Sequence, residues 1–131
     1  MKFGYTIIYV NSVADVLAFY EKAFGFKTKF LHDSGEYGEL DTGGTTALAF
    51  ASLGLAEANF GKGYLPVSAK ALPPGIELAF ITDDVQSAYQ NAVDCGASPV
   101  GSPVQKPWGQ VVAYVRSIEG TLIELCSPIG A

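Results

Sequence analysis

Two parts of this 131-residue chain show the same order of local patterns, and this repeat limits the available folds more than any other feature. In each part, a strand pattern is followed by an amphipathic helix pattern and then by three further strand patterns. An internal repeat indicates similar modules packed together. We therefore predict an α+β fold of two β-α-β-β-β modules. A single domain, residues 1–131, would contain module one (1–51), a connection (52–75) and module two (76–131).

Module one begins with FGYTIIYV (residues 3–10), which is rich in the β-branched and aromatic residues typical of strands. Ser12 then begins a predicted helix that ends at Gly25, because serine is a favoured N-cap and glycine is favoured just after a helix. The apolar side of this helix follows i, i+3, i+4, i+7 spacing at Val16, Phe19, Tyr20 and Ala23. Three further strand patterns occupy residues 26–32, 35–41 and 45–51.

Module two repeats this order, starting with the strand pattern GIELAFIT (75–82). Asp83 and Asp84 can cap the helix that follows, and Gly96 ends it. The remaining strand patterns are a proline-broken one at 98–105 and two stronger ones at 109–116 and 121–127.

The connection between the modules is punctuated by Gly and Pro and is long for a loop inside a small domain. Such a connection is usually functional or spans two modules. We expect its aromatic residues Phe60 and Tyr64 to anchor it or to form a dimer contact.

Charge and composition limit the classes of partner. The net charge is −5, and the eight Lys and Arg residues are scattered, which argues against a nucleic-acid groove or an anionic membrane surface as partner. No apolar run approaches the roughly 20 residues of a membrane span. Cys95 and Cys126 do not form a metal-type CxxC pair, so we expect reduced thiols in a cytoplasmic protein.

Two carboxylates interrupt otherwise apolar strand patterns: Glu77 in GIELAFIT and Glu124 in GTLIELCSP (120–128). An unpaired ionised carboxylate in an apolar setting is costly, so each must find partners or take up a proton. One interpretation is a structural network, in which the two share a proton or pair with Arg116 or a lysine. The other is a polar contact inside a ligand site.

The chain resembles the vicinal oxygen chelate superfamily, which includes glyoxalase I, bleomycin-resistance proteins and extradiol dioxygenases. The resemblance rests on the repeated element order and on FYEKAFGF (19–26), DV…A…CGA (84–97) and GTLIELCSP. It covers nearly the whole chain. It implies a curved, partly open mixed sheet around a cavity, and a homodimer.

The resemblance also implies four metal-ligand positions, which fall here at Tyr5, Ala49, Glu77 and Glu124. Alanine cannot ligate a metal and tyrosine is an uncommon ligand, so Glu77 and Glu124 alone are candidates for a divalent ion such as Zn, Mn, Ni or Fe. The only histidine, His32, is expected at an exposed strand end. One histidine cannot build the two-His triad of non-haem iron enzymes, which argues against an extradiol dioxygenase.

The strand alternation favours a ligand cavity instead. Ala49 lies on a face of small residues in the pattern 45–51, which leaves room above it. Aromatic and polar residues that can surround such a space suit a planar organic ligand. The predicted ligand-binding residues are Tyr5, Ile7, Tyr9, Ala49, Glu77, Trp108 and Glu124.

We therefore predict a protein of the glyoxalase/bleomycin-resistance type that binds a small molecule and requires no cofactor. Its ligand would be a toxic or antibiotic-like aromatic or cationic compound, which the protein sequesters. The alternative is an enzyme, a divalent-metal-dependent lyase or isomerase of the glyoxalase type that uses Glu77 and Glu124. A third possibility is a regulatory module with a vestigial cavity.

Overall fold

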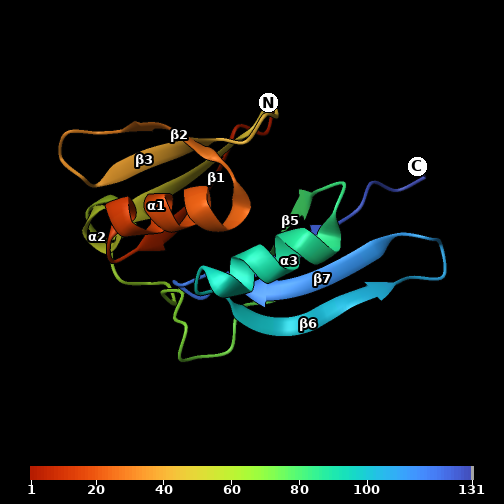
Figure 1. Ribbon diagram of the computed structural model, residues 1–131. Coiled ribbons are helices and arrows are strands. Elements are labelled where there is room, and N and C mark those ends of the chain that lie inside the picture. Colours follow the sequence, from red (N-terminus) through yellow and green to blue (C-terminus); the bar gives the residue numbers. More distant parts are fainter. Residues whose placement is uncertain (131) are drawn as a thin grey trace. The chain divides into compact units, whose positions relative to one another are not determined.

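The computed structural model describes residues 1–130, and these form two compact units, residues 1–67 and residues from 68 onward. The first unit contains β1 (Tyr5–Val10), α1 (Val13–Phe24), β2 (Lys27–Leu31), β3 (Tyr37–Asp41), β4 (Ala47–Ser52) and α2 (Leu53–Phe60). Its sheet has the strand order β1-β4-β3-β2, in which β1 and β4 are parallel and the other pairs antiparallel (Figure 1).

The second unit has the same plan. It contains β5 (Glu77–Ile81), α3 (Val85–Asp94), β6 (Ser98–Gln105), β7 (Val111–Arg116) and β8 (Leu122–Cys126). The strand order is β5-β8-β7-β6, with β5 and β8 parallel. The α+β class and the repeated β-α-β-β-β order are thus confirmed, and each module forms an open four-stranded mixed sheet of its own.

Helix α1 forms where the capping and apolar spacing predict it. The Ser12 hydroxyl accepts a hydrogen bond from the Asp15 N–H at 3.3 Å, and Gly25 ends the helix with a φ of 76°. Its buried side packs on β2, β3 and β4, where the rings of Tyr20 and Phe50 are 4.8 Å apart. Burying side chains of this size contributes about 1.5–3 kcal/mol each. One face of the first sheet is therefore covered by α1.

Helix α3 has the predicted cap as well, because the Asp84 carboxylate accepts a hydrogen bond from the Ser87 N–H at 3.0 Å. It packs mainly on β6 and β7 and also contacts β8. Strand β6 has the predicted bounds, and its register with β7 shifts between Pro99 and Gly101 and again before Val104. Both irregularities lie in the proline-containing segment.

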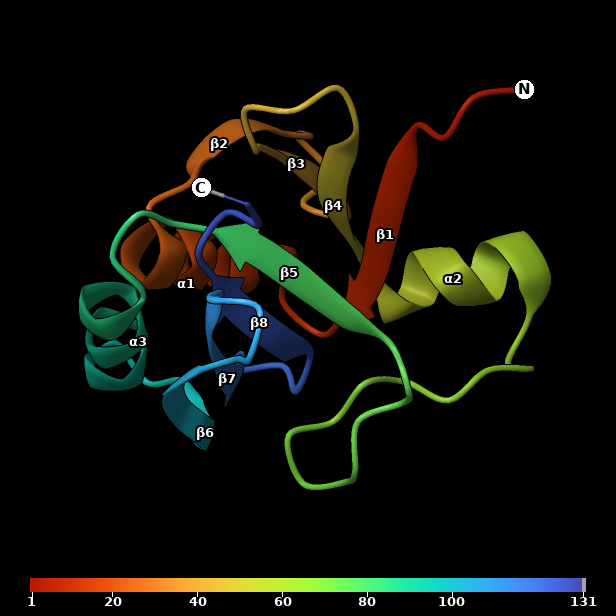
Figure 2. The ribbon, with the colours of Figure 1, turned by 90° about the vertical axis from the view of Figure 1, so that its right-hand side faces the viewer.

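Helix α2 was not predicted, because the connection was expected to lack regular structure. Ser52 caps it by accepting a hydrogen bond from the Leu55 N–H at 3.0 Å, but only Ala56 is buried, so the helix has no amphipathic pattern to reveal it. It contacts β4 and β1 (Figure 2). The expected anchoring of the connection is confirmed, since the rings of Phe60 and Tyr64 contact that of Tyr9 in edge-on and tilted arrangements, with centroids 5.6 and 6.0 Å away.

Within residues 1–130, no helix has both the length and the apolar character needed to cross a membrane.

Candidate functional site

In the first sheet, four predicted site residues lie on the face opposite α1. Strand pairing places Ile7 beside Ala49, Tyr5 beside Ala47 and Tyr9 beside Ala51, so all six side chains project to one side. Tyr5 is 60% exposed and Ile7 42% exposed, whereas Ala49 is fully buried beneath its neighbours. The structure therefore brings Tyr5, Ile7, Tyr9 and Ala49 together on one sheet face.

In the second sheet, the two predicted carboxylates lie on one face. Glu124 of β8 pairs with Ala79 of β5 on one side and with Tyr114 of β7 on the other. Glu77 is two residues before Ala79, so its side chain projects to the same face as that of Glu124. The Tyr114 hydroxyl donates a hydrogen bond to Glu124 Oε1 at 2.7 Å.

Glu77 and Glu124 interact directly. Although Glu77 keeps solvent contact, partial burial raises its pKa, and the charge of Glu124 and a side-chain hydrogen bond between the two raise it further. The raised pKa of Glu77 agrees with the interpretation in which the two carboxyl groups share a proton. Arg116 is not their counter-ion, because its guanidinium donates to the backbone oxygens of Gly120 and Ser68.

Two neighbouring groups are held in their protonated forms. The hydrogen bond to Glu124, followed by burial, raises the pKa of Tyr114 to about 12. Burial, followed by Glu124, raises the pKa of the Cys126 thiol, whose Sγ lies 3.7 Å from the Phe80 carbonyl oxygen. Tyr114 is therefore a hydrogen-bond donor to the carboxylate pair near neutral pH.

The residues at the four family ligand positions do not fit a glyoxalase-type metal centre. Catalytic zinc sites usually have three protein ligands, whereas Ala49 offers no donor atom. No group of three or more His, Cys, Asp or Glu side chains in residues 1–130 is arranged to hold a metal ion. His32 is exposed at the end of β2, as predicted, and its Nδ1 hydrogen-bonds with Ser34 Oγ at 2.8 Å.

Trp108 is not placed beside Glu77. It is 62% exposed in the turn between β6 and β7, where its indole N–H donates to Gln110 Oε1 at 3.0 Å. Gln110 in turn donates to the Ser127 carbonyl, so this turn lies beyond the Cys126 end of the sheet. Glu77 pairs with Leu122 at the other end of β8. Leu122 lies four residues from Cys126, which is about 13 Å along the strand.

Sequence reasoning missed a second tyrosine–carboxylate pair, in the first unit. The Tyr37 hydroxyl donates to Glu39 Oε2 at 2.8 Å, and the Glu39 side chain is only 8% exposed. Glu39 pairs with Ala49 across β3 and β4, as Tyr114 pairs with Glu124 across β7 and β8. The alternation in GEYGELD (35–41) places Tyr37 and Glu39 on the same face of their strand, and this signal could have identified the pair once the register with β4 was known.

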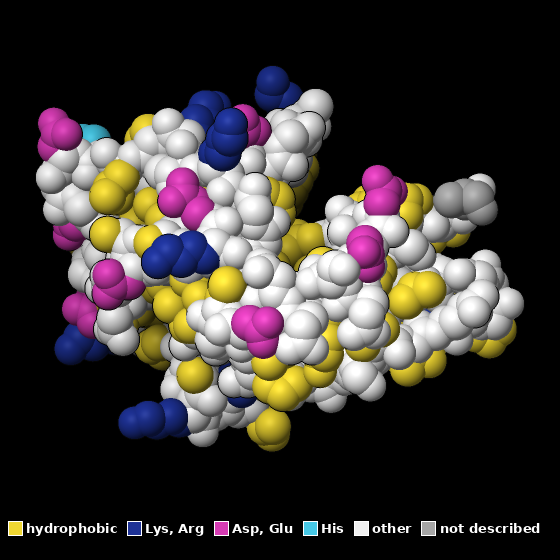
Figure 3. Space-filling model, viewed as in Figure 1, with side chains coloured by type: hydrophobic (Ala, Val, Ile, Leu, Met, Phe, Trp, Pro, Cys, Tyr) yellow, Lys and Arg dark blue, Asp and Glu magenta, His cyan; other side chains and the backbone are white. Residues whose placement is uncertain are grey.

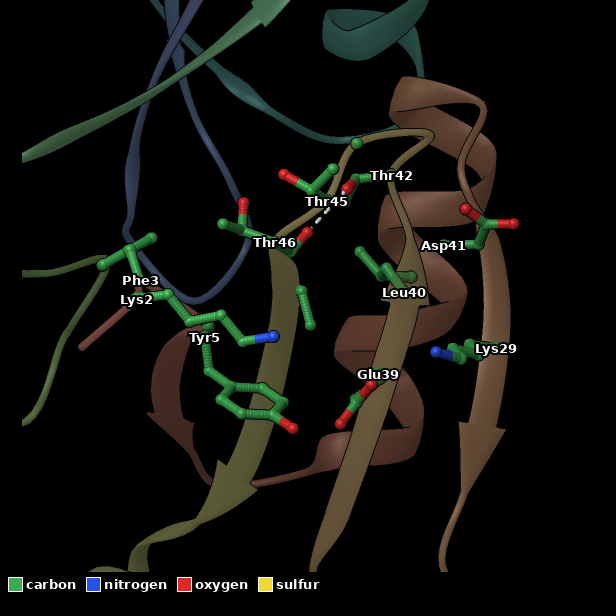
Figure 4. A pocket seen from close by; sticks show the side chains of 13 residues that line it. Lys2, Phe3, Tyr5, Lys29, Glu39, Leu40, Asp41, Thr42, Thr45 and Thr46 are labelled. Atoms are coloured by element: carbon green, nitrogen blue, oxygen red, sulfur yellow. Dashed lines mark hydrogen bonds between the residues drawn. The ribbon is translucent and has the colours of Figure 1, made fainter.

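A pocket of about 570 Å³ lies beside Glu39, within the first unit (Figure 4). The side chains of Lys2, Tyr5, Lys29 and Glu39 surround it, from the N-terminal segment, β1, β2 and β3 respectively. It is also lined by Phe3, Gly4, Leu40, Asp41, Thr42, Gly44, Thr45, Thr46 and Ala47.

Two open mixed sheets built on one β-α-β-β-β plan, with carboxylates on a face that their helices leave uncovered, define a protein of the vicinal oxygen chelate fold. The sequence model of the glyoxalase-like domain family matches residues 3–130. The chain therefore belongs to the glyoxalase-like domain family.

Solved structures of the same superfamily share this fold. A glyoxalase-related enzyme from Fulvimarina pelagi is 19% identical with a TM-score of 0.80, over 100% of this chain and 94% of that one. A glyoxalase/bleomycin resistance protein/dioxygenase family enzyme from Burkholderia phytofirmans is 20% identical with a TM-score of 0.75, covering 95% and 96%. A superfamily member from Sphaerobacter thermophilus is 21% identical with a TM-score of 0.73, covering 98% of each chain. At these identities the likeness shows the fold alone, and no curated protein matches the sequence.

Proposed function

We propose that this protein binds a small aromatic or cationic molecule without covalent chemistry and thereby sequesters it. The observation that carries this proposal is the pair Glu77 and Glu124, which lies on the uncovered face of the second sheet with the Tyr114 hydroxyl bound to Glu124. Two carboxylates without further protein ligands suit an organic cation better than a catalytic metal ion. The homodimeric state and the cytoplasmic location expected from the sequence remain predictions.

The carboxylate pair has the chemistry of a cation site. Tyr114 fixes the orientation of Glu124, and the raised pKa of Glu77 shows that the two carboxyl groups repel each other when both are ionised. A ligand ammonium or guanidinium group that replaces the shared proton would relieve this repulsion. Charge-assisted hydrogen bonds to carboxylates are the stronger class of hydrogen bond in proteins.

The uncovered face of the first sheet offers apolar contact for an aromatic ligand. Tyr5 and Ile7 are exposed there, and their strand partners on β4 are alanines, whose small side chains project little from the sheet. Large aromatic side chains favour offset or edge contacts with planar rings. This face supports the aromatic part of the proposed ligand class.

Thermal-shift measurements with cationic and aromatic compounds test the proposal. A compound at about 100 times its Kd stabilises the folded protein by about 2.7 kcal/mol. For a cationic compound so identified, we expect Glu124→Gln and Glu77→Gln each to weaken binding by about tenfold, since hydrogen bonds to charged groups contribute about 1.5–3 kcal/mol. Glu57→Gln, on the exposed surface of α2, is the matched control and leaves binding unchanged. Equal affinity in all variants would place the site elsewhere and refute the proposal.

A further inference from the structure

The pocket of the first unit is a candidate site in its own right. Its volume of about 570 Å³ lies within the usual range for small-molecule sites, about 300–1,000 Å³. All its lining residues fall between Lys2 and Ala47, so it does not involve Glu77 or Glu124. Its chemistry can therefore be considered separately from that of the carboxylate pair.

Glu39 gives this pocket a buried carboxylate that a hydrogen bond holds in place. The side chain is 8% exposed, and a carboxylate so strongly buried is stable only with hydrogen-bond partners. The Tyr37 hydroxyl donates to Oε2, which leaves Oε1 for a group inside the pocket. Burial, together with the hydrogen bond to Glu39, raises the pKa of Tyr37, so this phenol remains protonated and holds Glu39 in place.

Two lysines supply the opposite charge. The register between β2 and β3 shifts between Thr28 and Phe30, which makes Lys29 the extra residue of a β-bulge. Bulges redirect side chains and are frequent beside functional sites, and Lys29 lines the pocket. Lys2 reaches the pocket from the N-terminal segment (Figure 4). On the face shown in Figure 3, basic side chains gather over β2 and the N-terminal residues.

An aromatic ring and small residues complete the pocket. The side chain of Tyr5 lies on the same side of the sheet as Glu39, and its strand partner is the small residue Ala47. The other carboxylate of the lining, Asp41, is exposed to solvent and accepts a hydrogen bond from the Gly43 N–H of its own turn, whereas Glu39 is only 8% exposed. Glu39 is therefore the acidic group best placed to meet a ligand.

We propose that this pocket binds a small zwitterion with an apolar, preferably aromatic, part, such as an aromatic amino acid. The ligand ammonium group donates to Glu39, its acidic group contacts Lys29 and Lys2, and its ring lies against Tyr5. All the residues of this site belong to the first unit. The ligand carries both a positive and a negative group because the pocket is lined by both a carboxylate and lysines.

Three matched probes test the proposal: L-phenylalanine, phenethylamine (without the carboxylate) and 3-phenylpropionate (without the ammonium group). Each is titrated to about 10 mM, where weak binding is still measurable, and amide chemical shifts are followed by two-dimensional NMR. We expect saturable shifts centred on residues 37–47. Phenylalanine should bind about tenfold more tightly than either analogue, since each charged contact lowers the Kd by about tenfold.

Two variants assign the two charges. Glu39→Gln keeps the shape of the side chain and should remove the preference for phenylalanine over 3-phenylpropionate. Lys29→Gln should reduce the preference for phenylalanine over phenethylamine. Glu57→Gln, on the exposed surface of α2 in the same unit, is the control and leaves all three affinities unchanged. Shifts centred on residues 37–47 would support this pocket even if the carboxylate pair of the sequestration proposal bound nothing. No saturable shift with any probe, or equal preferences in Glu39→Gln and the natural protein, would overturn the inference.

Discussion

Glu77 lies where its neutral form is favoured. Partial burial and the nearby Glu124 both raise its pKa above the ordinary value for a glutamate. The folded protein therefore binds this proton more tightly than the unfolded chain does. It follows that Glu77 stabilises the fold in acid, and that this stabilisation is lost as the pH rises through the raised pKa.

We expect Glu77→Gln to increase the free energy of unfolding near neutral pH and to change it little in acid. The increase is at most about 1 kcal/mol, because solvent screens an exposed side chain. Urea unfolding between about pH 4 and about pH 8 measures the difference, which should grow with pH above the ordinary glutamate pKa. Glu57→Gln serves as the exposed control. A loss of stability in Glu77→Gln at neutral pH would contradict the raised pKa of Glu77.

For single residues, the sequence predicted the face of a side chain more successfully than its partners. Strand alternation has a period of two, so Tyr5 and Ile7 could be assigned to one face of their strand from local order alone. Ala49 could be added to that face only through the family resemblance, and the pairing of β1 with β4 places it beside Ile7. The Tyr114 hydrogen bond to Glu124 depends on the pairing of β7 with β8, which local order does not reveal. Glu39 was missed because the pattern around it contains other acidic residues, and its burial depends on neighbouring strands.

At the scale of elements, the turn between β7 and β8 is fixed by one glycine. Gly120 has a φ of 104°, and a Cβ atom there would lie 2.6 Å from the carbonyl carbon of Ser68. Arg116 donates to both the Ser68 and the Gly120 carbonyl oxygens, so the start of the second unit is held against this turn. The turn therefore needs both the left-handed backbone and the absence of a side chain.

We expect Gly120→Ala to destabilise the protein by about 3 kcal/mol or more, through backbone strain and a clash with backbone atoms that cannot move aside cheaply. Gly109→Ala is the matched control, because its φ is 91° but no atom lies within 4 Å of the added Cβ. It carries the strain alone, about 1–2 kcal/mol. Urea unfolding measures both losses of unfolding free energy, from the shift of the midpoint at an unchanged m-value. Equal losses in the two variants would show that the contact with Ser68 is not made.

Elements with strong local signals were predicted, and those without them were not. Helix α1 has an N-cap at Ser12, a helical apolar stripe and a C-terminal glycine, all of which agree. Helix α2 has a cap at Ser52, but it buries little beyond Ala56, so its apolar residues show no helical period. Its position depends on contacts with β4 and β1, which are not local.

In the whole molecule, the repeat predicted from the sequence extends further than the order of elements. Each sheet carries a tyrosine that donates to a glutamate on its uncovered face, Tyr37 to Glu39 and Tyr114 to Glu124. The carboxylates do not occupy equivalent positions, because Glu124 corresponds to Ala49, and Glu39 lies on the strand beside Ala49. The two modules thus keep one kind of polar pair but place it on different strands.

The two cysteines of the chain report on the opening of the second unit. Cys95 is exposed, whereas Cys126 lies in β8, is 4% exposed, and has a thiol pKa raised by burial. Since the thiolate is the reactive form, we expect an aromatic disulfide reagent to modify one thiol of the native protein at once. The second should react at least about 100-fold more slowly, because it requires unfolding of the sheet. Cys95→Ser removes the fast phase and leaves the slow one, and urea near the midpoint merges the two. Rapid modification of both thiols in the absence of urea would contradict the burial of Cys126 and, with it, the packed β5-β8-β7 sheet that carries the carboxylate pair.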